Sequence, residues 1–478
     1  MFSPFKTFLF LLSCLLLLGI TSFLIEKNEG KIFNDYKIKF YSINNLLNYK
    51  NNQALEDSVE KIIKETEIVE KEVDSIKTEE KTIVADTLKI FQVLKSIPYD
   101  KNFISKIEYP NGDKNILNYL LKSLKNATHQ STHILYYGDS QIEEDRFSGY
   151  IREKLQLSFG GSGCGLLSIM PIAQWLAPRI QYSENWYKWD CFADAGSKDE
   201  TYGIMAQSFL IDFSKGKGKW ISKCKDATST NVCLFNKVIM YYGNAIDSTQ
   251  VKFFNNGELI SEVILKSNDN FNKQIFAVKN NEEISFEISG KTSPYFYGIS
   301  LESFNNGVYV DNIALRGSSG TFFHLISRDL LKRFFNDLNV SMIVLQFGGN
   351  TMPLIDSEEK AKKFGSYIDY QIKTIKSIAP QVPILFVGPS DMSVNIDGVM
   401  QTHPYLESVI NELKKVVLSN NCAFFDMYKA MGGKNSMPIW VEQNLAAKDY
   451  IHFSPAGARK MASIIYYSLI KDLQEINL

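Results

Sequence analysis

The chain has 478 residues, a formal net charge of −1 and six cysteines. That length is enough to bury a large core and to form more than one domain. Because the charge is balanced and no basic block occurs, the composition argues against nucleic acid as a partner.

The first 25 residues have the pattern of a membrane signal. Residues 7–25 carry no charge and are rich in Leu and Phe, and these nineteen residues suffice to cross a bilayer core. No A-x-A-like cleavage site follows, so we expect residues 1–25 to remain as an anchor. With Lys6 on the inner side, the rest of the chain is expected outside the cytoplasm. The alternative is a lipoprotein signal ending at Cys14, although the apolar run continues past that residue.

Residues 26–105 are rich in Lys, Glu and Asn and show no sustained apolar pattern. The segment Glu56–Lys81 carries dense mixed charge that would suit a solvated helix. We predict that residues 26–105 form a stalk or linker.

From residue 106 the pattern becomes that of an α/β fold. A helical apolar stripe over residues 116–124 leads into the buried strand His133–Tyr137, the turn Gly138-Asp139-Ser140 and a helical segment containing Tyr150 and Leu155. Ser140 is therefore expected at the junction of a strand and a helix. There a free backbone N–H and the helix dipole favour a developing negative charge, so we assign residues 106–174 to the first part of a catalytic domain.

Residues 175–310 form short alternating runs separated by Asn, Gly, Asp and Ser. The runs are Val232–Phe235, Lys237–Tyr242, Gln250–Phe254, Glu258–Leu265 and Glu283–Ser289, with a turn at Asn255-Asn256-Gly257. This spacing predicts an inserted β-sandwich or jelly roll. Cys224 and Cys233 are close enough to form a disulfide in an oxidising compartment. No cysteine or histidine spacing fits a structural zinc site, and we predict no metal ligands.

Residues 311–478 return to α/β alternation. The expected strands are Asn312–Leu315, Met342–Phe347, Pro383–Val387 and Cys422–Phe425, and the expected helices are Phe322–Phe335, Glu358–Ile378, Leu406–Leu418 and a last helix with Ser454 as N-cap and Pro455 at its first position. With the strand before Ser140, this predicts five parallel strands sandwiched by helices. Ligands of such sheets bind at the carboxyl ends of the strands.

Polar residues suited to acyl transfer fall at those ends. Arg316-Gly317-Ser318-Ser319-Gly320 follows the second strand, Phe347-Gly348-Gly349-Asn350 follows the third, and Asp449 and His452 precede the last helix. A nucleophilic serine needs a base, the base needs an orienting carboxylate, and the oxyanion needs donors. The sequence contains all four parts. Glu143, Glu144 and Asp145 have the residue type of acid catalysts, but an acidic first turn also complements the helix dipole. Asp391 is a further candidate for lining the cleft.

These residues resemble the four sequence blocks of the SGNH (GDSL-type) hydrolases, over residues 130–170 and 311–478. The resemblance implies a flavodoxin-like five-stranded parallel sheet. It implies that Ser140 is the nucleophile, His452 the general base and Asp449 its orienting acid. The implied oxyanion hole consists of Ser140, Gly320 and Asn350, with Gly317 as the alternative to Gly320. The chain departs from the family pattern at Gln141, where Leu is usual, and at Thr351, where Asp often stands.

Tyr297–Glu302 and Val310–Gly320 resemble bacterial peptidoglycan O-acetylesterases, in which a carbohydrate-binding-like β-sandwich interrupts the hydrolase. The resemblance implies a serine esterase of the cell envelope, anchored in the inner membrane with a periplasmic or extracellular catalytic body, that acts on acetylated cell-wall polysaccharide. No cofactor is implied, although such inserted modules often bind calcium, for which no ligands are assigned. The alternatives are an O-acetyltransferase, a deacetylase of another extracellular polysaccharide, or a non-catalytic glycan-binding membrane protein.

Overall fold

The computed structural model describes residues 106–175, 177–191, 201–224, 231–279 and 282–476, and the backbone of a short antiparallel pair, β1 (Lys31–Phe33) and β2 (Tyr36–Lys37). The expected anchor over residues 1–25 and most of the expected stalk lie outside these residues. Within the described ranges, no helix is both long and apolar enough to cross a membrane.

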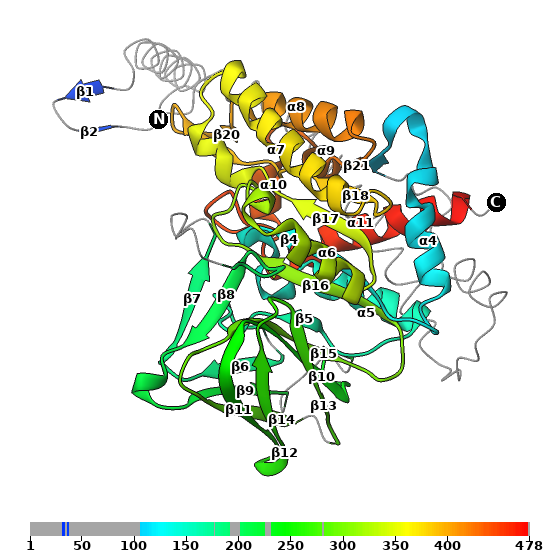
Figure 1. The fold of residues 1–478 in the computed structure, drawn as a ribbon. Coiled ribbons are helices and arrows are strands. Elements are labelled where there is room, and N and C mark those ends of the chain that lie inside the picture. Colours follow the sequence, from blue (N-terminus) through cyan, green and yellow to red (C-terminus); the bar gives the residue numbers. More distant parts are fainter. Residues whose placement is uncertain are drawn as a thin grey trace, which may run out of the picture.

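A mixed six-stranded sheet forms the centre of the upper part of the molecule (Figure 1). Its order is β16 (Val308–Ala314), β4 (Thr132–Gly138), β17 (Val340–Gln346), β18 (Ile384–Val387), β21 (Ala423–Phe425) and β3 (Ile107–Glu108). The first five strands are parallel and β3 is antiparallel. The five parallel strands are as predicted, and their order corresponds to the 2-1-3-4-5 order of flavodoxin-like sheets. The edge strand β3 was not predicted.

Helices cover both faces of this sheet. One face packs against α4 (Asn118–Lys125), α5 (Ser148–Phe159), α9 (Met427–Met431), α10 (Ser436–Glu442) and α11 (Pro455–Ile476), and the other against α6 (Arg328–Asp337), α7 (Glu358–Ile378) and α8 (Leu406–Ser419). Each face of the sheet has its own hydrophobic core, and alternate residues of a strand pack into one core or the other. In β17, Met342 and Val344 pack on one face and Ile343 and Leu345 on the opposite face. Short 3-10 helices occur at Pro110–Gly112, Lys114–Leu117, Ser140–Asp145 (η3), Phe213–Lys215, Phe323–Leu325 and Gly349–Leu354 (η6).

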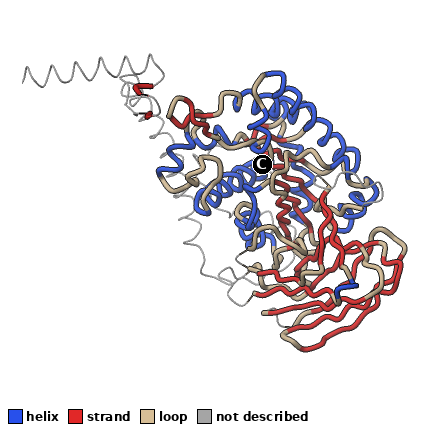
Figure 2. Tube along the Cα trace, turned by 90° about the vertical axis from the view of Figure 1, so that its left-hand side faces the viewer, coloured by secondary structure: helices blue, strands red, loops and turns tan. Residues whose placement is uncertain are grey.

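Between α5 and β16 the chain forms two antiparallel sheets, which occupy the strand-rich lower part of Figure 2. One sheet has the order β13 (Asn272–Ala277), β10 (Lys237–Gly243), β15 (Tyr295–Glu302), β8 (Gln207–Ile211) and β7 (Trp186–Asp190), with β5 (Gly165–Leu167) paired to β15. The other has the order β12 (Glu258–Ser267), β11 (Ala245–Asn255), β14 (Glu283–Ser289), β9 (Gly218–Lys223) and β6 (Arg179–Tyr182). We call this part the two-sheet insertion.

The local sequence patterns misplaced several boundaries. Val308–Val310, which we expected in the insertion, pair with Thr132–Ile134 of β4. Conversely, β5 lies in the segment expected to belong to the first α/β part, yet it joins a sheet of the insertion. Val232–Phe235 is a turn and loop, so the expected strand there is wrong. A hairpin of β19 (Ser393–Ile396) and β20 (Val399–Thr402) was not predicted.

The two-sheet insertion shares a continuous core with the α6–α8 side of the parallel sheet. The ring of Phe334 in α6 lies 4.8 Å from that of Phe271, 5.4 Å from that of Tyr241 and 5.7 Å from that of Tyr297. Aromatic contacts of this kind add to the energy of burial. Removing the insertion would therefore expose apolar surface of the parallel sheet.

A buried charged cluster also joins the two parts. His133 Nδ1 in β4 lies 2.7 Å from Asp311 Oδ2 in β16, and its Nε2 lies 3.6 Å from Glu302 Oε1 in β15. Lys237 Nζ of β10 completes the cluster, 2.7 Å from Glu302 Oε2. Burial lowers the pKa of His133, but the charge and hydrogen bond of Asp311 and the charge of Glu302 outweigh it, so the pKa is raised. Buried charges require partners of opposite charge. These contacts therefore fix how the two-sheet insertion is aligned with the parallel sheet.

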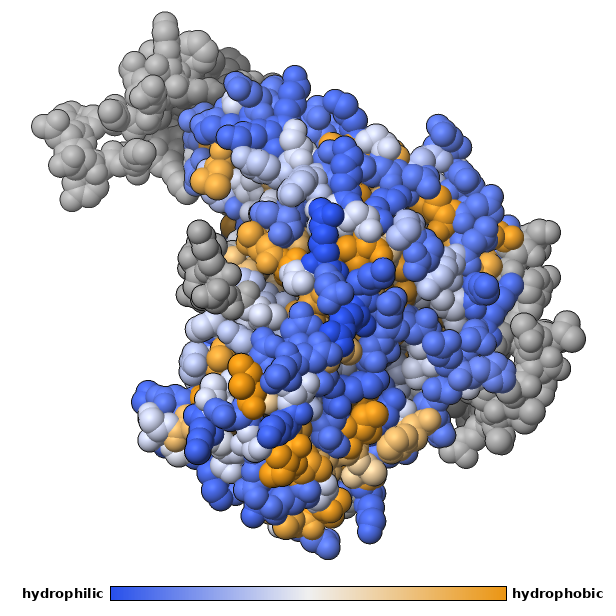
Figure 3. Space-filling model, in the orientation of Figure 1, coloured by the Kyte–Doolittle hydropathy of each residue, from blue (hydrophilic) through white to orange (hydrophobic). Residues whose placement is uncertain are grey.

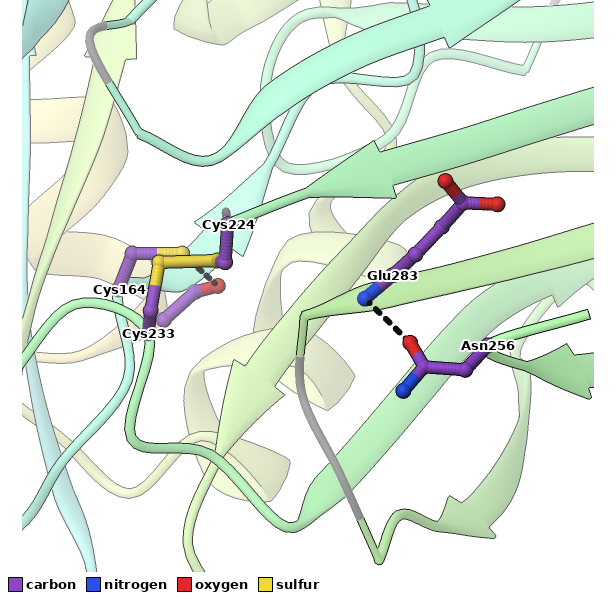
Figure 4. Close-up of a disulfide and its surroundings, with 6 residues drawn as sticks. Cys164, Cys224, Cys233, Asn256 and Glu283 are labelled. Carbon is purple, nitrogen blue, oxygen red and sulfur yellow. Dashed lines mark hydrogen bonds between the residues drawn. A yellow bond between two sulfur atoms is a disulfide. The ribbon is translucent and has the colours of Figure 1, made fainter. Parts of the chain in front are cut away.

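The predicted disulfide between Cys224 and Cys233 is confirmed (Figure 4). The other described cysteines, Cys164, Cys191 and Cys422, are free and buried. In the same close-up, Glu283 N donates to Asn256 Oδ1 at 3.0 Å, beside the turn between β11 and β12.

We expect the double substitution Cys224→Ser/Cys233→Ser to lower the unfolding free energy by about 2–3 kcal/mol. The bridge closes a loop with a sequence separation of 9, and the chain-entropy estimate for so short a loop is of that size. Urea unfolding measures the difference. Dithiothreitol should destabilise the wild type to the same degree and leave the variant unchanged, whereas equal stabilities without reductant would contradict the prediction.

Apolar side chains are also exposed on the insertion, and orange patches lie over its β-rich part in Figure 3. The exposed large apolar residues of strands β11 to β13 are Ile246, Leu259, Ile260, Ile264 and Ile275.

Candidate active site

The turn that carries Ser140 is built by a glycine and a 3-10 helix. A Cβ on Gly138 would lie 2.9 Å from Ile142 Cγ2, so a larger residue where β4 enters the turn would have to displace the buried Ile142 side chain. Ser140 begins η3, the chain kinks at Glu143 and Glu144, and α5 starts only at Ser148. The expectation that Ser140 opens the long helix is therefore wrong. The turn is held instead by Asn312, whose Nδ2 donates to Ile142 O at 2.8 Å.

The structure brings Ser140, His452 and Asp449 into one hydrogen-bonded chain. Ser140 Oγ lies 2.9 Å from His452 Nε2, and His452 Nδ1 lies 2.8 Å from Asp449 Oδ2. Ser140 is 312 residues from His452 in sequence. This is the geometry in which an imidazole can remove a hydroxyl proton while a carboxylate fixes its tautomer.

The side chain of Asp449 is held in place by backbone groups of its own loop, which precedes α11. Asp449 Oδ1 accepts hydrogen bonds from the backbone N–H groups of Ile451 at 2.9 Å and His452 at 3.0 Å, and Tyr450 takes a φ of 59° that closes the turn. Partial burial raises the pKa of Asp449, but hydrogen bonds from His452 and Ile451 outweigh it, so the net pKa is lowered. Asp449 is therefore ionised at neutral pH. Ser454, the predicted N-cap of the last helix, accepts from Gly457 N at 3.2 Å.

Gln141 links the serine turn to the histidine loop, which the sequence did not reveal. Its Nε2 donates to Ile451 O at 2.7 Å, and its Oε1 accepts from Phe453 N at 3.3 Å. These two backbone groups flank His452. A leucine, usual at this position in the SGNH pattern, has no polar atom with which to make either bond. The only sequence signal was the departure from that pattern.

Asn350 joins the loops that follow three strands. Its Nδ2 donates to Asp139 Oδ2 at 3.0 Å and to Ser318 O at 3.2 Å. Asp139 also accepts from Gln141 N at 2.9 Å through its other oxygen. Asp139 is 4% exposed, so a nearly inaccessible carboxylate orients the amide of Asn350. We assigned no role to Asp139 from the sequence.

The two candidate glycines lie in different surroundings. Gly320 is buried, its N–H donates to Ser318 Oγ at 3.1 Å, and a Cβ there would lie 2.6 Å from the Phe347 ring. Gly317 is exposed at a φ of 78°, within a turn closed by the bond from Ser318 N to Leu315 O, and it lines the same hollow as Ser140. Gly317 therefore borders the hollow at Ser140, whereas the N–H of Gly320 already has a partner.

The acidic residues after Ser140 form ion pairs, and none makes a side-chain cap bond to the backbone of α5. Arg316 Nε and Nη2 each donate to one oxygen of Glu143 at 2.6 Å, and Arg152 pairs with Asp145. Asp145 also accepts from Ser148 Oγ at 2.7 Å, so its carboxylate lies at the first residue of α5, whereas Glu143 is engaged by Arg316. Asp391 is fully buried and accepts from Thr402 Oγ1 and Met437 N at 2.8 Å, which makes it a structural residue.

Two hollows meet at Ser140. The inner hollow, of about 150 Å³, is lined by Asp139, Ser140, Gln141, Gln346, Phe347, Gly349, Asn350, Pro353, Pro389, Ser390, Met392, Met427, Ile451 and His452. The outer hollow, of about 730 Å³, is lined by Ser140, Glu143, Glu144, Arg146, Arg316, Gly317, Asn350, Ala447, His452, Phe453, Ser454 and Pro455. A narrow junction hollow, of about 50 Å³, lies between the end of β16 and the two-sheet insertion, and shares Glu143 and Glu144 with the outer hollow.

Within the part of the chain that the structure describes, no cluster of three or more His, Cys, Asp or Glu residues has the arrangement of a metal site.

Protonation of Asp139 should change both stability and activity. Burial raises its pKa from 3.8 to about 6, against hydrogen bonds from Gln141 and Asn350 and the charge of His452, which lower it. A carboxyl whose pKa is raised on folding contributes stability below its unfolded pKa, and this contribution is lost as the pH rises through the folded value. At 1.36 kcal/mol per pKa unit, the difference is roughly 3 kcal/mol.

We therefore expect Asp139→Asn to gain up to about 3 kcal/mol in unfolding free energy relative to wild type between pH 4 and pH 8. Urea unfolding across that range measures it. Asp356→Asn is the control, because the hydrogen bond from Lys360 lowers the pKa of Asp356 and no such gain is expected. A stability difference independent of pH would contradict the assignment of a buried, ionised Asp139. The variant should also lose activity, because Asn350 loses its anchoring carboxylate.

No model of a known protein family matches this chain, and no curated protein matches it. A solved structure of a peptidoglycan O-acetylesterase aligns with a TM-score of 0.60 and 18% identity, over 77% of this chain and 99% of that one. An acetyl xylan esterase aligns with a TM-score of 0.27 and 16% identity, over 34% of this chain and 81% of that one. A family two carbohydrate esterase from Cellvibrio japonicus aligns with a TM-score of 0.25 and 10% identity, over 62% of this chain and 100% of that one. The first likeness establishes a shared fold, and the other two are too weak to carry an argument.

Proposed function

We propose that this chain is a serine esterase that removes O-acetyl groups from cell-wall glycan, with peptidoglycan as the substrate class. The observation that carries the proposal is the hydrogen-bonded chain from Ser140 through His452 to Asp449, with distances of 2.9 and 2.8 Å. It lies beside the carboxyl ends of β4 and β17, where ligands of parallel sheets bind.

In the proposed reaction, His452 Nε2 takes the proton of Ser140 Oγ as the oxygen attacks the ester carbonyl. The tetrahedral intermediate collapses when His452 returns that proton to the departing sugar oxygen, which leaves an acetyl-serine and a free sugar hydroxyl. Water then attacks the acetyl-serine with His452 as base, and acetate leaves as Ser140 regains its proton. Asp449 holds the imidazole and stabilises its positive charge.

The backbone N–H groups of Ser140 and Gly317 and the Nδ2 of Asn350 are proposed as the oxyanion donors. Gly317 takes this place ahead of Gly320, because Gly317 faces the outer hollow and the Gly320 N–H already donates to Ser318 Oγ. Asn350 would exchange its long bond to Ser318 O, at 3.2 Å, for the oxyanion. Such donors are worth most where charge develops in the transition state.

The glycan substrate is supported by the outer hollow and by the structural likeness. The outer hollow is wide and has charged walls that include Arg146, Arg316, Glu143 and Glu144, which suits a polar polymer. The chain shares its fold with a peptidoglycan O-acetylesterase over most of its length.

We further propose that the protein belongs to the cell envelope, anchored by residues 7–25, with the catalytic body outside the cytoplasm. The uncharged run of that segment and the disulfide between Cys224 and Cys233 support this location.

Acetate release from O-acetylated peptidoglycan tests the proposal. The purified chain without residues 1–105 should release acetate, and Ser140→Ala should not. Acetyl transfer to an added muropeptide without free acetate would indicate a transferase. Release only from another acetylated polysaccharide would indicate a deacetylase of that polymer, and binding without turnover would indicate a glycan-binding protein.

The junction hollow is expected to contribute to polymer binding. Its walls come from β16 and from the insertion, which contributes Leu167, Ser168, Met170, Pro171, Ile172, Ala173, Trp175, Pro178 and Ile180, and it meets the outer hollow at Glu143 and Glu144. Binding energy from remote sugar units can position an ester at the nucleophile. Ile172, in its wall and 46% exposed, can be changed with little cost to the fold.

We expect Ile172→Asn to lower kcat/KM on O-acetylated peptidoglycan about tenfold and to change p-nitrophenyl acetate hydrolysis less than threefold, the scale of one lost apolar contact. Leu157→Asn, on the exposed side of α5 at 57% exposure, is the matched control. Equal losses on both substrates would mean that the junction hollow is part of the catalytic site. No loss on either substrate would mean that the junction hollow does not contribute to polymer binding. Such a point substitution is cleaner than deleting residues 175–310, which would cut into β16.

A further inference from the structure

The acyl half of the substrate can be assigned to one side of Ser140. Three residues, Ser140, Asn350 and His452, line both the inner and the outer hollow. A carbonyl carbon attached to Ser140 Oγ, with its oxygen directed at Asn350, therefore projects its two other substituents into the two hollows. One substituent is the sugar oxygen and the other is the acyl chain.

Size and polarity decide which substituent enters which hollow. A sugar within a polymer is bulky and polar, and only the outer hollow, about 730 Å³ with charged walls, admits it. The inner hollow is about 150 Å³, and its walls include the apolar side chains of Phe347, Pro353 and Met392. The acyl chain therefore belongs in the inner hollow.

The inner hollow is larger than an acetyl group requires. A water molecule occupies about 30 Å³ in the liquid, so about 150 Å³ holds several groups of that size, while acetyl places a single methyl group beyond its carbonyl carbon. At about 30 Å³ per carbon group, the space accepts at least the two further methylene groups of a butyryl chain, whereas an octanoyl tail exceeds it.

The wall of this hollow also carries a polar amide, that of Gln346, which does not favour a long hydrocarbon chain. Gln346 is 2% exposed, and its Oε1 accepts from Tyr136 Oη at 2.7 Å. Its Nε2 is buried and has no hydrogen-bond partner among the described residues. With the amide assigned the other way round, the Oε1 would be the atom without a partner. A hydrocarbon chain packed in the hollow offers this amide no hydrogen-bond partner.

We propose that the inner hollow is the acyl-binding site and that it accepts acyl groups from acetyl to about four carbons, while excluding long chains. This proposal rests on the proposed esterase function. It assigns acyl specificity to the residues around Gly349, Met392 and Gln346.

A series of p-nitrophenyl esters tests the proposal. For the wild type, kcat/KM on propionate and butyrate should lie within fivefold of that on acetate, and octanoate should be at least tenfold lower. A preference for acetate over propionate of more than tenfold would overturn the proposal. Failure to hydrolyse any ester would instead overturn the proposed function.

Two substitutions alter the size of the inner hollow in opposite directions. A Cβ on Gly349 would lie 3.6 Å from Met392 Sδ and 3.8 Å from Asp139 Oδ2, which is ordinary contact, so Gly349→Ala adds a methyl group without strain. Met392→Ala removes side-chain volume from the same wall. One methylene in an apolar pocket is worth about tenfold or more in specificity.

We expect Gly349→Ala to lower the butyrate-to-acetate ratio of kcat/KM at least fivefold and Met392→Ala to raise the octanoate-to-acetate ratio at least fivefold. Leu354→Ala, at the end of η6 and 69% exposed, should leave both ratios unchanged. If both hollow variants change all esters in proportion, the inner hollow does not hold the acyl chain. Circular dichroism and thermal unfolding establish that each variant is folded.

Discussion

Ser140→Ala should lower kcat on a small acetyl ester by at least about 10⁴-fold, because the nucleophile proposed to form the acyl-enzyme is lost. The side chain contacts His452 at 2.9 Å and is half-buried, so its removal leaves the turn after β4 with its backbone bonds intact. The measurement is hydrolysis of p-nitrophenyl acetate. Thermal unfolding within a few degrees of the wild type shows that the loss is chemical.

The matched control for this substitution is Ser366→Ala on the surface of α7, where the hydroxyl donates to Lys362 O at 3.1 Å. It should retain full activity. Ser140→Ala activity above a few per cent of wild type would exclude the serine mechanism. A covalent acetyl group found on Ser140 by mass spectrometry of rapidly quenched enzyme would support it directly.

Asn350→Ala should lower kcat by about 10²–10³-fold, the usual loss for one oxyanion donor. The effect should fall on kcat more than on KM, because the donor binds the transition-state charge more strongly than the ground-state carbonyl. Steady-state kinetics on a small acetyl ester measure it. An unchanged kcat would leave Asn350 with a purely structural role between Asp139 and Ser318.

That structural role requires its own control, since Asn350 Nδ2 bonds both Asp139 and Ser318. Asn420→Ala removes a comparable pair of amide bonds, to Asp369 Oδ1 at 2.7 Å and Val416 O at 2.8 Å, at the end of α8. We expect a similar change in unfolding temperature for the two variants and a kinetic loss for Asn350→Ala alone.

Local sequence signals predicted most of the elements that carry the site. The bounds of α7, Glu358–Ile378, follow its apolar period, and the hairpin at Asn256-Gly257 follows from residues that tolerate positive φ, here 50° and 79°. Ser454 and Pro455 marked the start of α11. These features depend on backbone preferences within a few residues, which any chain with that local sequence would share.

The candidate residues at strand ends were also accessible from the sequence, because parallel strands place their carboxyl ends at one edge of the sheet. Ser140, Asn350, Asp449 and His452 could be selected as a set on that ground and through the family resemblance. Their hydrogen-bonded arrangement could not be derived, since it depends on how loops from separate strands pack together.

Only the tertiary structure shows that Gly317 and Gly320 lie in different surroundings, because both follow the same strand in a similar local sequence. One faces the outer hollow, while the other packs against the Phe347 ring. The bridge from Gln141 to Ile451 spans 310 residues, and the pairing of His133 with Asp311 joins strands 178 residues apart. Such contacts are fixed by which surfaces the folded chain buries against each other, and no short window of sequence contains both partners.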